Sequence, residues 1–359
     1  MKQILCLSNE PWSSSPGRTQ QLIARLKDTQ ILYFSPFAGR NDRFAGPKGR
    51  QVRPNVTAYS LPPLPLHLQE RYGALFRLER RRLGRFVADR AARHRFREPL
   101  LWTTNPEHVH LLDDLDYGGL VYDCDRDWED LPPAWEGSLA QAADVVFAAS
   151  PLLKQRLAPC SSNIALLPNG VNFPLFSSPD SSPRPRTHGP VLGWEGTIWE
   201  DLDLEPLLYA ARMRPDWTFL LVGRQEDNPL LPRLRRLENV ILAGPKPLSE
   251  LPEWLHRCDV FLNFVREDRP YEDVVASRLY EYLSTGKPVV SMLWPDQVER
   301  FPDVVYAAYD DQEFLTLCQH ALTEAPGFVS QRRRSHAAAA AWPRRAAEVA
   351  RILGMAGLL

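Results

Sequence analysis

The chain has 359 residues, of which 44% are hydrophobic and 24% are charged, and its formal net charge is −1. This length is enough for two domains of ordinary size, and the hydrophobic share excludes a chain that is disordered by composition. The near-neutral charge argues against a protein that mainly wraps nucleic acid, so we expect no nucleic-acid partner.

Short apolar runs rich in β-branched residues alternate with helical stretches along the chain. Continuous runs of this kind are typical of strands covered on both faces, and the alternation predicts βαβ units with parallel sheets. The predicted strands of the first half are residues 3–7, 30–34, 100–103, 120–124, 145–149 and 164–167. Those of the second half are residues 191–194, 218–222, 240–243, 260–264, 288–292 and 304–307.

Residues 173–190 interrupt this alternation, because they are rich in Pro and Ser and show no period. They predict a linker between two doubly wound, Rossmann-like α/β domains, residues 1–172 and 191–336. Two such domains would face each other across a cleft lined by the carboxyl ends of their strands. Residues 337–359 predict a terminal helix, bent at Trp342-Pro343, that packs back on the N-terminal domain.

The N-terminus and the spacing of the cysteines indicate the cellular compartment of the protein. The first predicted strand leaves no room for a signal peptide, and no run approaches the roughly 18–20 apolar residues that span a bilayer. No two cysteines have C-x-x-C spacing, so we expect neither a zinc site nor a disulfide, and we expect a cytoplasmic location. The cysteines are Cys6, Cys124, Cys160, Cys258 and Cys318.

Pro16, Gly17 and Arg18 end a loop, rich in Ser and Pro, that leads from the first predicted strand into a helix. A loop of this kind can approach a ligand closely, so these residues are cleft candidates. The loop lacks the Gly-Lys-Ser/Thr ending of a P-loop. A plain strand-to-helix connection is the alternative.

Asp123, Asp125 and Asp127 alternate at the end of the strand predicted at 120–124. A divalent cation is one possible ligand, but the cluster lacks the glycine and the spacing of a calcium loop, and we expect no metal. We prefer hydrogen bonding to an acceptor, or catalysis by Asp123 or Asp125 as a general base. A capped turn before Glu129 is the alternative.

Arginines crowd residues 71–97, with apolar residues interleaved at roughly helical spacing. A basic amphipathic helix can rest on anionic lipid, which predicts peripheral contact with the inner face of the membrane. We slightly prefer the alternative, a solvated face on which Glu79 and Asp89 pair with some of the arginines. The arginines are Arg71, Arg77, Arg80, Arg81, Arg82, Arg85, Arg90, Arg93, Arg95 and Arg97.

Residues 271–291 join a short helical pattern to a Gly-Lys-Pro break and an apolar strand. Asp273 can cap a helix that begins near Ala276, and the amides of residues 274–276 (Val274, Val275 and Ala276) would then face an anion. Glu281 could accept hydrogen bonds from a ribose diol, and Arg278 could hold a phosphate. The alternative is an amphipathic helix with a solvated Glu281 paired to Arg278.

These motifs resemble those of GT-B glycosyltransferases, in particular the retaining, family-4-like enzymes of bacterial polysaccharide synthesis. Asp273-x(7)-Glu281 followed by Tyr-Leu-Ser-Thr-Gly-Lys-Pro resembles their E-x(7)-E region. Residues 122–128, 143–153 and 167–172 resemble the stretches YDCVDDW, ADVVFATSPLL and LPNGVD of these enzymes. Cys258-Asp259-Val260 resembles the FDV that opens a later strand. The matches keep the order of the family over most of the chain.

The resemblance implies a GT-B fold of two Rossmann-like domains and a hexosyltransferase of the EC 2.4 class that needs no cofactor. A nucleotide-sugar donor would bind the C-terminal domain, and a glycan or lipid-linked acceptor would bind the N-terminal domain beside residues 16–18. Glu281 would hold the ribose and Asp273 the sugar hydroxyls, although Asp is one methylene shorter than the usual Glu. Retention of anomeric configuration is implied as well.

One stretch departs from the pattern, because residues 195–203 are acidic where the family places cations for the diphosphate. Gly196 and Thr197 of this stretch belong to the predicted donor site. Arg224, Lys246 or Arg278 could supply the missing positive charge. A non-catalytic scaffold with the same fold, or a nucleotide-sugar epimerase, is the alternative.

Overall fold

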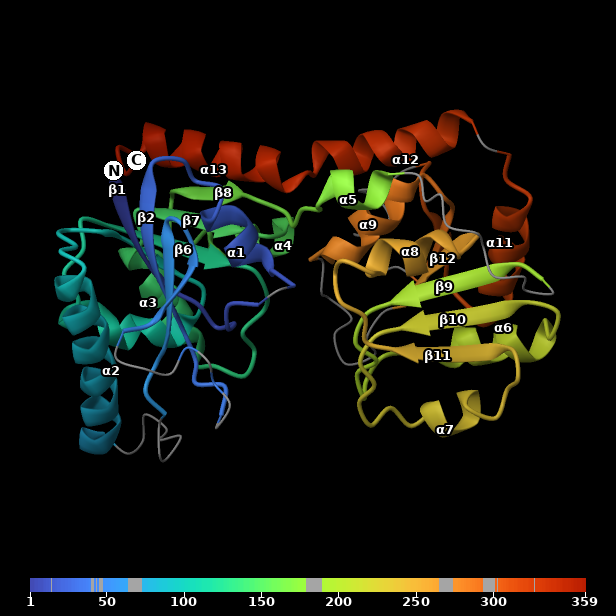
Figure 1. Ribbon diagram of the computed structural model, residues 1–359, viewed down its shortest axis with the longest axis horizontal. Helices are drawn as coiled ribbons and strands as arrows, with labels where there is room; N and C mark the ends of the chain where they lie inside the picture. The colour runs from blue at the N-terminus through green and yellow to red at the C-terminus, as the bar shows by residue number, and fades with distance from the viewer. Residues whose placement is uncertain are drawn as a thin grey trace. The chain divides into compact units, whose positions relative to one another are not determined.

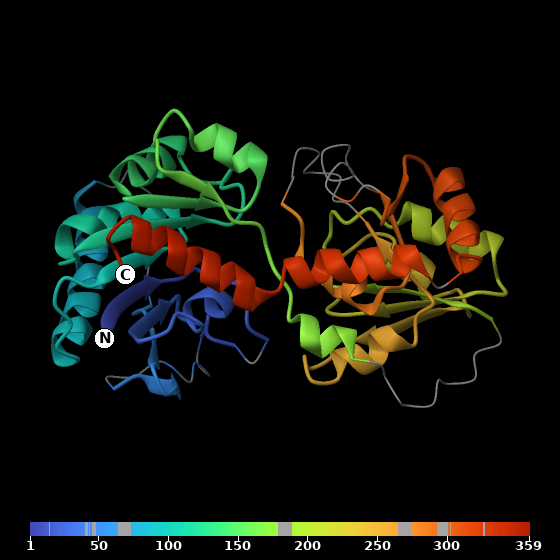
Figure 2. The ribbon, with the colours of Figure 1, turned by 90° about the horizontal axis from the view of Figure 1, so that it is seen from above.

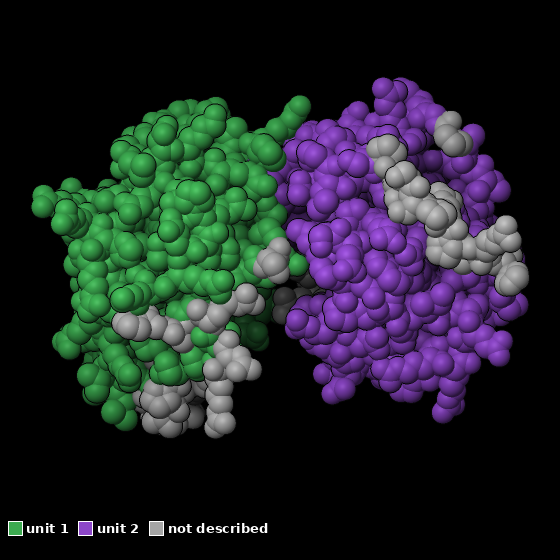
Figure 3. All heavy atoms as spheres, viewed as in Figure 1, with its two compact units in different colours: residues 1–168, 343–359 green, residues 169–342 purple. Residues whose placement is uncertain are grey.

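The computed structural model describes the chain apart from residues 14, 40–41, 43, 45–47, 64–72, 179–188, 265–273, 293–300, 302 and 326. The chain forms two compact units, which Figure 3 shows in different colours. Unit 1 contains residues 1–168 and 343–359, and unit 2 contains residues 169–342. Within the described residues, no helix has the length and apolar character needed to cross a bilayer.

Unit 1 is built on an eight-stranded sheet in the order β3-β4-β2-β1-β5-β6-β7-β8 (Figure 1). All neighbouring strands are parallel except β3 and β4, which form an antiparallel pair at one edge. The strands are β1 (Lys2–Leu7), β2 (Thr29–Ser35), β3 (Arg50–Arg53), β4 (Val56–Ser60), β5 (Leu100–Thr103), β6 (Gly119–Cys124), β7 (Val145–Ala148) and β8 (Ile164–Leu166). The strands predicted for the first half are all present, whereas β3 and β4 were not predicted.

Helices cover this sheet, and the long α2 packs against the 3-10 helix η2 at one side of the unit (Figure 1). The C-terminal α13 lies along the same unit (Figure 2). Leu358, which follows α13, approaches Gly119 of β6. The helices are α1 (Arg18–Ile23), α2 (Ala74–Arg93), η2 (Pro106–Asp114), α3 (Pro133–Ala142), α4 (Pro151–Leu157) and α13 (Trp342–Met355), of which α13 belongs to this unit from Pro343 onward.

Unit 2 is built on a six-stranded sheet in the order β11-β10-β9-β12-β13-β14, in which every pair is parallel. The strands are β9 (Val191–Glu195), β10 (Thr218–Val222), β11 (Val240–Gly244), β12 (Val260–Asn263), β13 (Val289–Met292) and β14 (Tyr306–Ala308). The helices are α5 (Phe173–Ser177), α6 (Glu205–Met213), α7 (Leu231–Leu234), α8 (Leu251–His256), α9 (Ser277–Thr285), α11 (Asp311–Leu322) and α12 (Phe328–Ala339).

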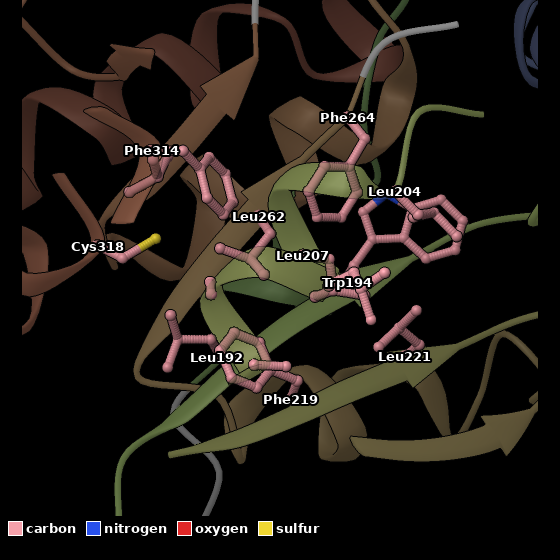
Figure 4. Packing of buried hydrophobic residues seen from close by; sticks show 14 of the residues in the cluster. Leu192, Trp194, Leu204, Leu207, Phe219, Leu221, Leu262, Phe264, Phe314 and Cys318 are labelled. Atoms are coloured by element: carbon pink, nitrogen blue, oxygen red, sulfur yellow. The ribbon is translucent and has the colours of Figure 1, made fainter. Parts of the chain in front are cut away.

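Both faces of the unit 2 sheet are buried, which explains why its strands are continuous apolar runs. On one face, Trp194, Phe219 and Leu262 pack against residues of α6 and α11 (Figure 4). On the other face, Leu220 and Phe261 pack against residues of α5, α8 and α9. Side chains that alternate along one strand therefore enter two separate cores.

The structure differs from the predicted linker and terminal helix. The segment 173–177 is the helix α5, and its Phe176 is 1% exposed in the core of unit 2. The terminal segment is two helices, because α12 ends before Trp342-Pro343 and α13 begins there. Proline lacks the backbone N–H that a continuing helix needs, but it is well suited to the first turn of a new one.

Arg333 of α12 is buried and ties three segments of unit 2 together. Its Nε donates to the carbonyl of Val304 at 2.8 Å, and its Nη2 donates to Glu324 Oε2 at 2.7 Å. Tyr306 donates to the same carboxylate at 2.6 Å. Although burial acts in the opposite direction, the hydrogen bonds from Arg333 and Tyr306 lower the pKa of Glu324.

We expect Glu324→Gln to make the unfolding free energy of unit 2 depend less on pH in the acidic range. A carboxyl group whose pKa is lowered by folding stabilises the fold above its unfolded pKa of about 4.3, and this stabilisation is lost as the pH falls through the folded pKa. Urea denaturation of the parent protein and of the Glu324→Gln variant, between neutral and acidic pH, measures the effect. A difference in unfolding free energy that does not shrink toward acidic pH would contradict it.

Candidate functional site

Two glycines bring strand ends together at the carboxyl edge of the unit 2 sheet. Because β9, β10, β11 and β12 are parallel, their carboxyl ends lie at the same edge. Gly196 follows β9 with φ +148°, and Gly223 follows β10 with φ +149°. A Cβ atom on Gly223 would lie 1.7 Å from the carbonyl oxygen of Gly196, so only glycine allows this approach of the two turns.

Arg278 lies at this edge, on the first turn of α9. Its Nε donates to Asn263 Oδ1 at 3.3 Å, and Asn263 is in turn held by a 2.8 Å hydrogen bond to Ser291 Oγ. Its guanidinium carbon is 5.4 Å from the centre of the Trp194 ring, and a Cβ atom on Gly196 would be 2.8 Å from its Nη1. Neighbours from β9, β12 and β13 therefore fix a cation near a helix N-terminus, a combination suited to phosphate.

Two carboxyl groups share the surroundings of Arg278. Burial and then the charge of Glu195 raise the pKa of Glu281 well above its usual range, while Arg278 opposes both. Burial also raises the pKa of Glu195, again opposed by Arg278. Within the described part of the chain, the Glu281 carboxyl has no hydrogen bond. Arg278 is one cation shared by two partly buried carboxyl groups. Their oxygens can therefore still accept hydrogen bonds from the hydroxyl groups of a ligand.

Tyr282 fixes the backbone at the end of β9. Its hydroxyl accepts a hydrogen bond from the Glu195 N–H at 2.7 Å, and its ring stacks on Phe261 at 4.3 Å. Neither Tyr282 nor Asn263 was named as a site residue from sequence. For Asn263 a signal existed, since it is a polar residue that ends an apolar strand.

The start of α9 lies one residue later than predicted, at Ser277, and the N-cap residue Ala276 provides no side-chain cap. The amides at the helix N-terminus are therefore those of Ser277 and Arg278 rather than those of Val274 and Val275. Val275 is buried, and its carbonyl accepts a hydrogen bond from Asn169 at 3.0 Å. Asp273 lies outside the described residues.

The other predicted donor-site residues follow the same strand ends. Lys246, after β11, lies with its Nζ 4.3 Å from the centre of the Trp254 ring. Arg224, after β10, is exposed, and its carbonyl accepts a hydrogen bond from the Ile198 N–H at 2.8 Å, next to the half-buried Thr197. Of the cations predicted for the diphosphate, Arg278 thus has the most closely defined surroundings.

Parts of the acidic stretch 195–203 serve the local fold. Asp203 accepts a hydrogen bond from the Glu205 N–H at 3.0 Å, at the start of α6. Asn228 donates to the carbonyls of Trp199 at 2.8 Å and Leu202 at 2.9 Å, which holds the turn between them. Glu195 is the carboxylate of this stretch whose charge acts on Glu281.

In unit 1, Arg18 and Asp123 form a buried ion pair. Arg18 Nη2 is 2.8 Å and Nε is 3.0 Å from Asp123 Oδ1, and the two residues are 7% and 0% exposed. Burial raises the pKa of Asp123, and Arg18 opposes this shift. The buried carboxylate of Asp123 thus holds the Arg18 side chain in place. The role of Asp123 or Asp125 as a general base stays a prediction.

The alternation of aspartates reflects three different arginine partners. Asp125 pairs with Arg126 at 3.1 Å, and Arg126 also contacts Glu10 at 3.2 Å. Asp127 pairs with Arg156. In the described parts of the chain, no group of three metal-ligating side chains occurs.

The loop before α1 closes on this network. Gly17 precedes Arg18 as the N-cap, and a Cβ atom there would lie 2.4 Å from Glu10 Oε2. Gln21 Nε2 donates to the carbonyl of Pro16 at 3.3 Å. Arg18 and Glu10 of this loop thus meet Asp123 and Arg126 at one edge of the unit 1 sheet.

The chain is similar to known proteins in sequence and in fold. Residues 202–323 match the family model described as glycosyl transferases group 1. The putative teichuronic acid biosynthesis glycosyltransferase TuaH of Bacillus subtilis is 28% identical over 250 residues, which are 62% of this chain and 63% of that protein. The chain thus spans less than two thirds of this curated relative.

Solved structures resemble the whole chain. Sucrose-phosphate synthase from Thermosynechococcus elongatus has a TM-score of 0.77 at 18% identity, with 99% of both chains covered. Anabaena HepE in complex with UDP and glucose has a TM-score of 0.71 at 15% identity, covering 99% of this chain and 100% of HepE.

These similarities confirm the GT-B fold. The stretch that matches the group 1 glycosyl transferase model contains Arg224, Lys246, Arg278 and Glu281. The finer assignment to retaining, family-4-like enzymes stays a prediction.

Proposed function

We propose that this protein is a glycosyltransferase that moves a sugar from a nucleotide-sugar to a glycan or lipid-linked acceptor in polysaccharide biosynthesis. The observation that carries the proposal is the placement of Arg278 and Glu281 together at the carboxyl edge of the unit 2 sheet, within the matched domain. The similarity to TuaH and to HepE, crystallised with UDP and with UDP-glucose, supports a polysaccharide product and a nucleotide-sugar donor.

Each residue has a role in this proposal. Glu281 accepts hydrogen bonds from the ribose hydroxyls, and Asp273 acts near the sugar, with retention of configuration. Arg278 binds the diphosphate and stabilises the negative charge that develops on it as the sugar leaves, assisted by Arg224 or Lys246. Asp125 hydrogen-bonds the acceptor, and neither a metal nor another cofactor is required.

A non-catalytic binding protein with the same fold is the second candidate, and Glu195 favours it. A carboxyl group beside Arg278 competes with a diphosphate for the same cation. Incubation with a panel of nucleotide-sugars and assay for released nucleoside diphosphate separates the two. Release from at least one donor supports the enzyme, and silence across the panel supports the binding protein.

We expect Glu281→Ala to weaken the binding of UDP by roughly 10- to 100-fold, the effect of leaving the ribose hydroxyls without their hydrogen-bond acceptor. Isothermal titration calorimetry measures the affinity directly. Glu238→Ala, at an exposed position of the same unit, is the matched control and should leave the affinity unchanged. Equal affinities of the Glu281→Ala variant and the parent protein would remove Glu281 from the ribose site.

A lipid-linked acceptor would bring the enzyme to a membrane. The arginine-rich segment 71–97 is the part of the chain suited to peripheral contact there.

A further inference from the structure

The side of α2 that points away from unit 1 carries both arginines and exposed leucines. The helix buries Phe76, Leu83 and Val87 against its own unit. With about 3.6 residues per turn, Leu78 and Arg82 lie on the opposite side of the helix. The outward face, as defined here, consists of Leu75, Arg77, Leu78, Arg81, Arg82 and Arg85, all of them exposed.

The positive charge of the outward face is not neutralised by the described part of the chain, where its four arginines form no ion pair. Elsewhere on the helix the cations are paired: Arg80 with Glu107, and Arg90 and Arg93 with Asp89. The first turn has no acidic residue, although carboxylates would stabilise a helix there. The helix dipole therefore gives no reason for arginines near the N-terminal end of α2.

Apolar side chains lie among these cations. Leu75 is 54% and Leu78 is 62% exposed, and the two are three positions apart on one side of the helix. Figure 1 shows α2 at the flank of unit 1.

We propose that the outward face of α2 docks on an anionic lipid bilayer, with Leu75 and Leu78 in the headgroup region and the arginines on lipid phosphates. Charge complementarity selects an anionic surface, and the exposed leucines select lipid over nucleic acid, whose phosphate backbone offers them no apolar contact. This proposal extends the peripheral contact considered above to a defined set of side chains. It does not depend on sugar transfer.

Co-sedimentation of the full chain with lipid vesicles tests this. We expect binding to vesicles of phosphatidylcholine mixed with phosphatidylglycerol, weakened by salt, and no binding to phosphatidylcholine alone. Arg82→Gln with Arg85→Gln should weaken binding roughly 10- to 30-fold, since each cation near an anionic surface contributes separately. Arg235→Gln with Arg236→Gln removes the same charge from an exposed part of unit 2 and should bind as the parent protein does.

A second variant probes the leucines. Leu78→Cys in a Cys160→Ser background allows labelling with an environment-sensitive dye, because the other native cysteines are buried. We expect a blue shift of the dye emission only with the phosphatidylglycerol vesicles.

Three outcomes would overturn the proposal: equal sedimentation with both kinds of vesicle, equal losses in the two arginine variants, or an unshifted dye. Binding of a single-stranded RNA oligonucleotide that is lost in the Arg82→Gln, Arg85→Gln variant, without vesicle binding, would assign the face to nucleic acid instead. Release of nucleoside diphosphate is measured without vesicles, so either proposal can fail while the other stands.

Discussion

Arg278→Met is expected to lower kcat/KM for the nucleotide-sugar donor by roughly 100- to 1,000-fold, the usual cost of losing a group that stabilises transition-state charge. The leaving diphosphate gains negative charge as the bond to the sugar breaks. Arg278 is held at the strand ends by Asn263 and packed beside Trp194, so it needs little reorganisation to meet that charge. Steady-state release of UDP from the preferred donor measures the effect.

Three matched variants make this prediction specific. Arg278→Lys keeps the charge but loses the fork of donors, so it should retain part of the activity. Arg224→Met and Lys246→Met remove the competing cations, and we expect smaller losses because Arg224 is exposed and Lys246 is stacked on Trp254. A larger loss in either of these than in Arg278→Met would transfer the diphosphate role to that residue. Unchanged thermal unfolding of each variant confirms that activity, and not folding, is compared.

The sequence predicted the fold well because each sheet is buried on both faces. Continuous apolar runs marked the inner strands, and Phe219, Leu220 and Leu221 of β10 indeed point alternately into the two cores. The edge strand β3 escaped notice because Arg50–Arg53 is polar and mostly exposed. An edge strand is held by hydrogen bonds on one side only, so its sequence carries a weaker pattern. The neighbouring β4 is an inner strand, paired with both β3 and β2, and was missed as well.

The sites were predicted less completely, because their geometry depends on contacts between distant parts of the chain. Arg278 and Glu281 are three positions apart on one helix, so their proximity could be expected. The approach of Glu195 to them depends on the pairing of β9 with β12, which no local pattern reveals. Arg18 precedes Asp123 by 105 positions, and the local sequence around neither residue predicts their contact.

The acidic stretch after β9 illustrates the same limit. Read along the chain, residues 195–203 place repeated negative charge where a diphosphate is expected. In the structure, Asp203 accepts a hydrogen bond from the Glu205 N–H at the start of α6, and the turn at residues 199–202 is held by Asn228. Glu195 is the carboxyl group of this stretch that acts on Arg278 and Glu281, and its pKa is raised by burial. Protonation of this one group would leave Arg278 available to phosphate.

Arg18→Met is expected to lower the unfolding free energy of unit 1 by about 3–5 kcal/mol, the usual cost of removing one partner of a buried ion pair. The variant leaves the carboxylate of Asp123, which is 0% exposed, without its cation. Urea denaturation gives the free energy, and hydrogen exchange of the amides in β1 and β6 locates the loss. Arg18→Met with Asp123→Leu removes both charges and should recover most of the stability.

The pH dependence of this variant separates a positioning role from a catalytic one. Burial already raises the pKa of Asp123, and without Arg18 the pKa should rise further. A carboxyl group with a raised folded pKa stabilises the fold below its unfolded pKa of about 3.9 and loses this contribution as the pH rises through the folded value. The stability gap between Arg18→Met and the parent protein should therefore narrow toward acidic pH. A gap that is independent of pH would show that Asp123 is already neutral beside Arg18. Full stability of Arg18→Met, with loss of activity alone, would return Arg18 and Asp123 to the acceptor site.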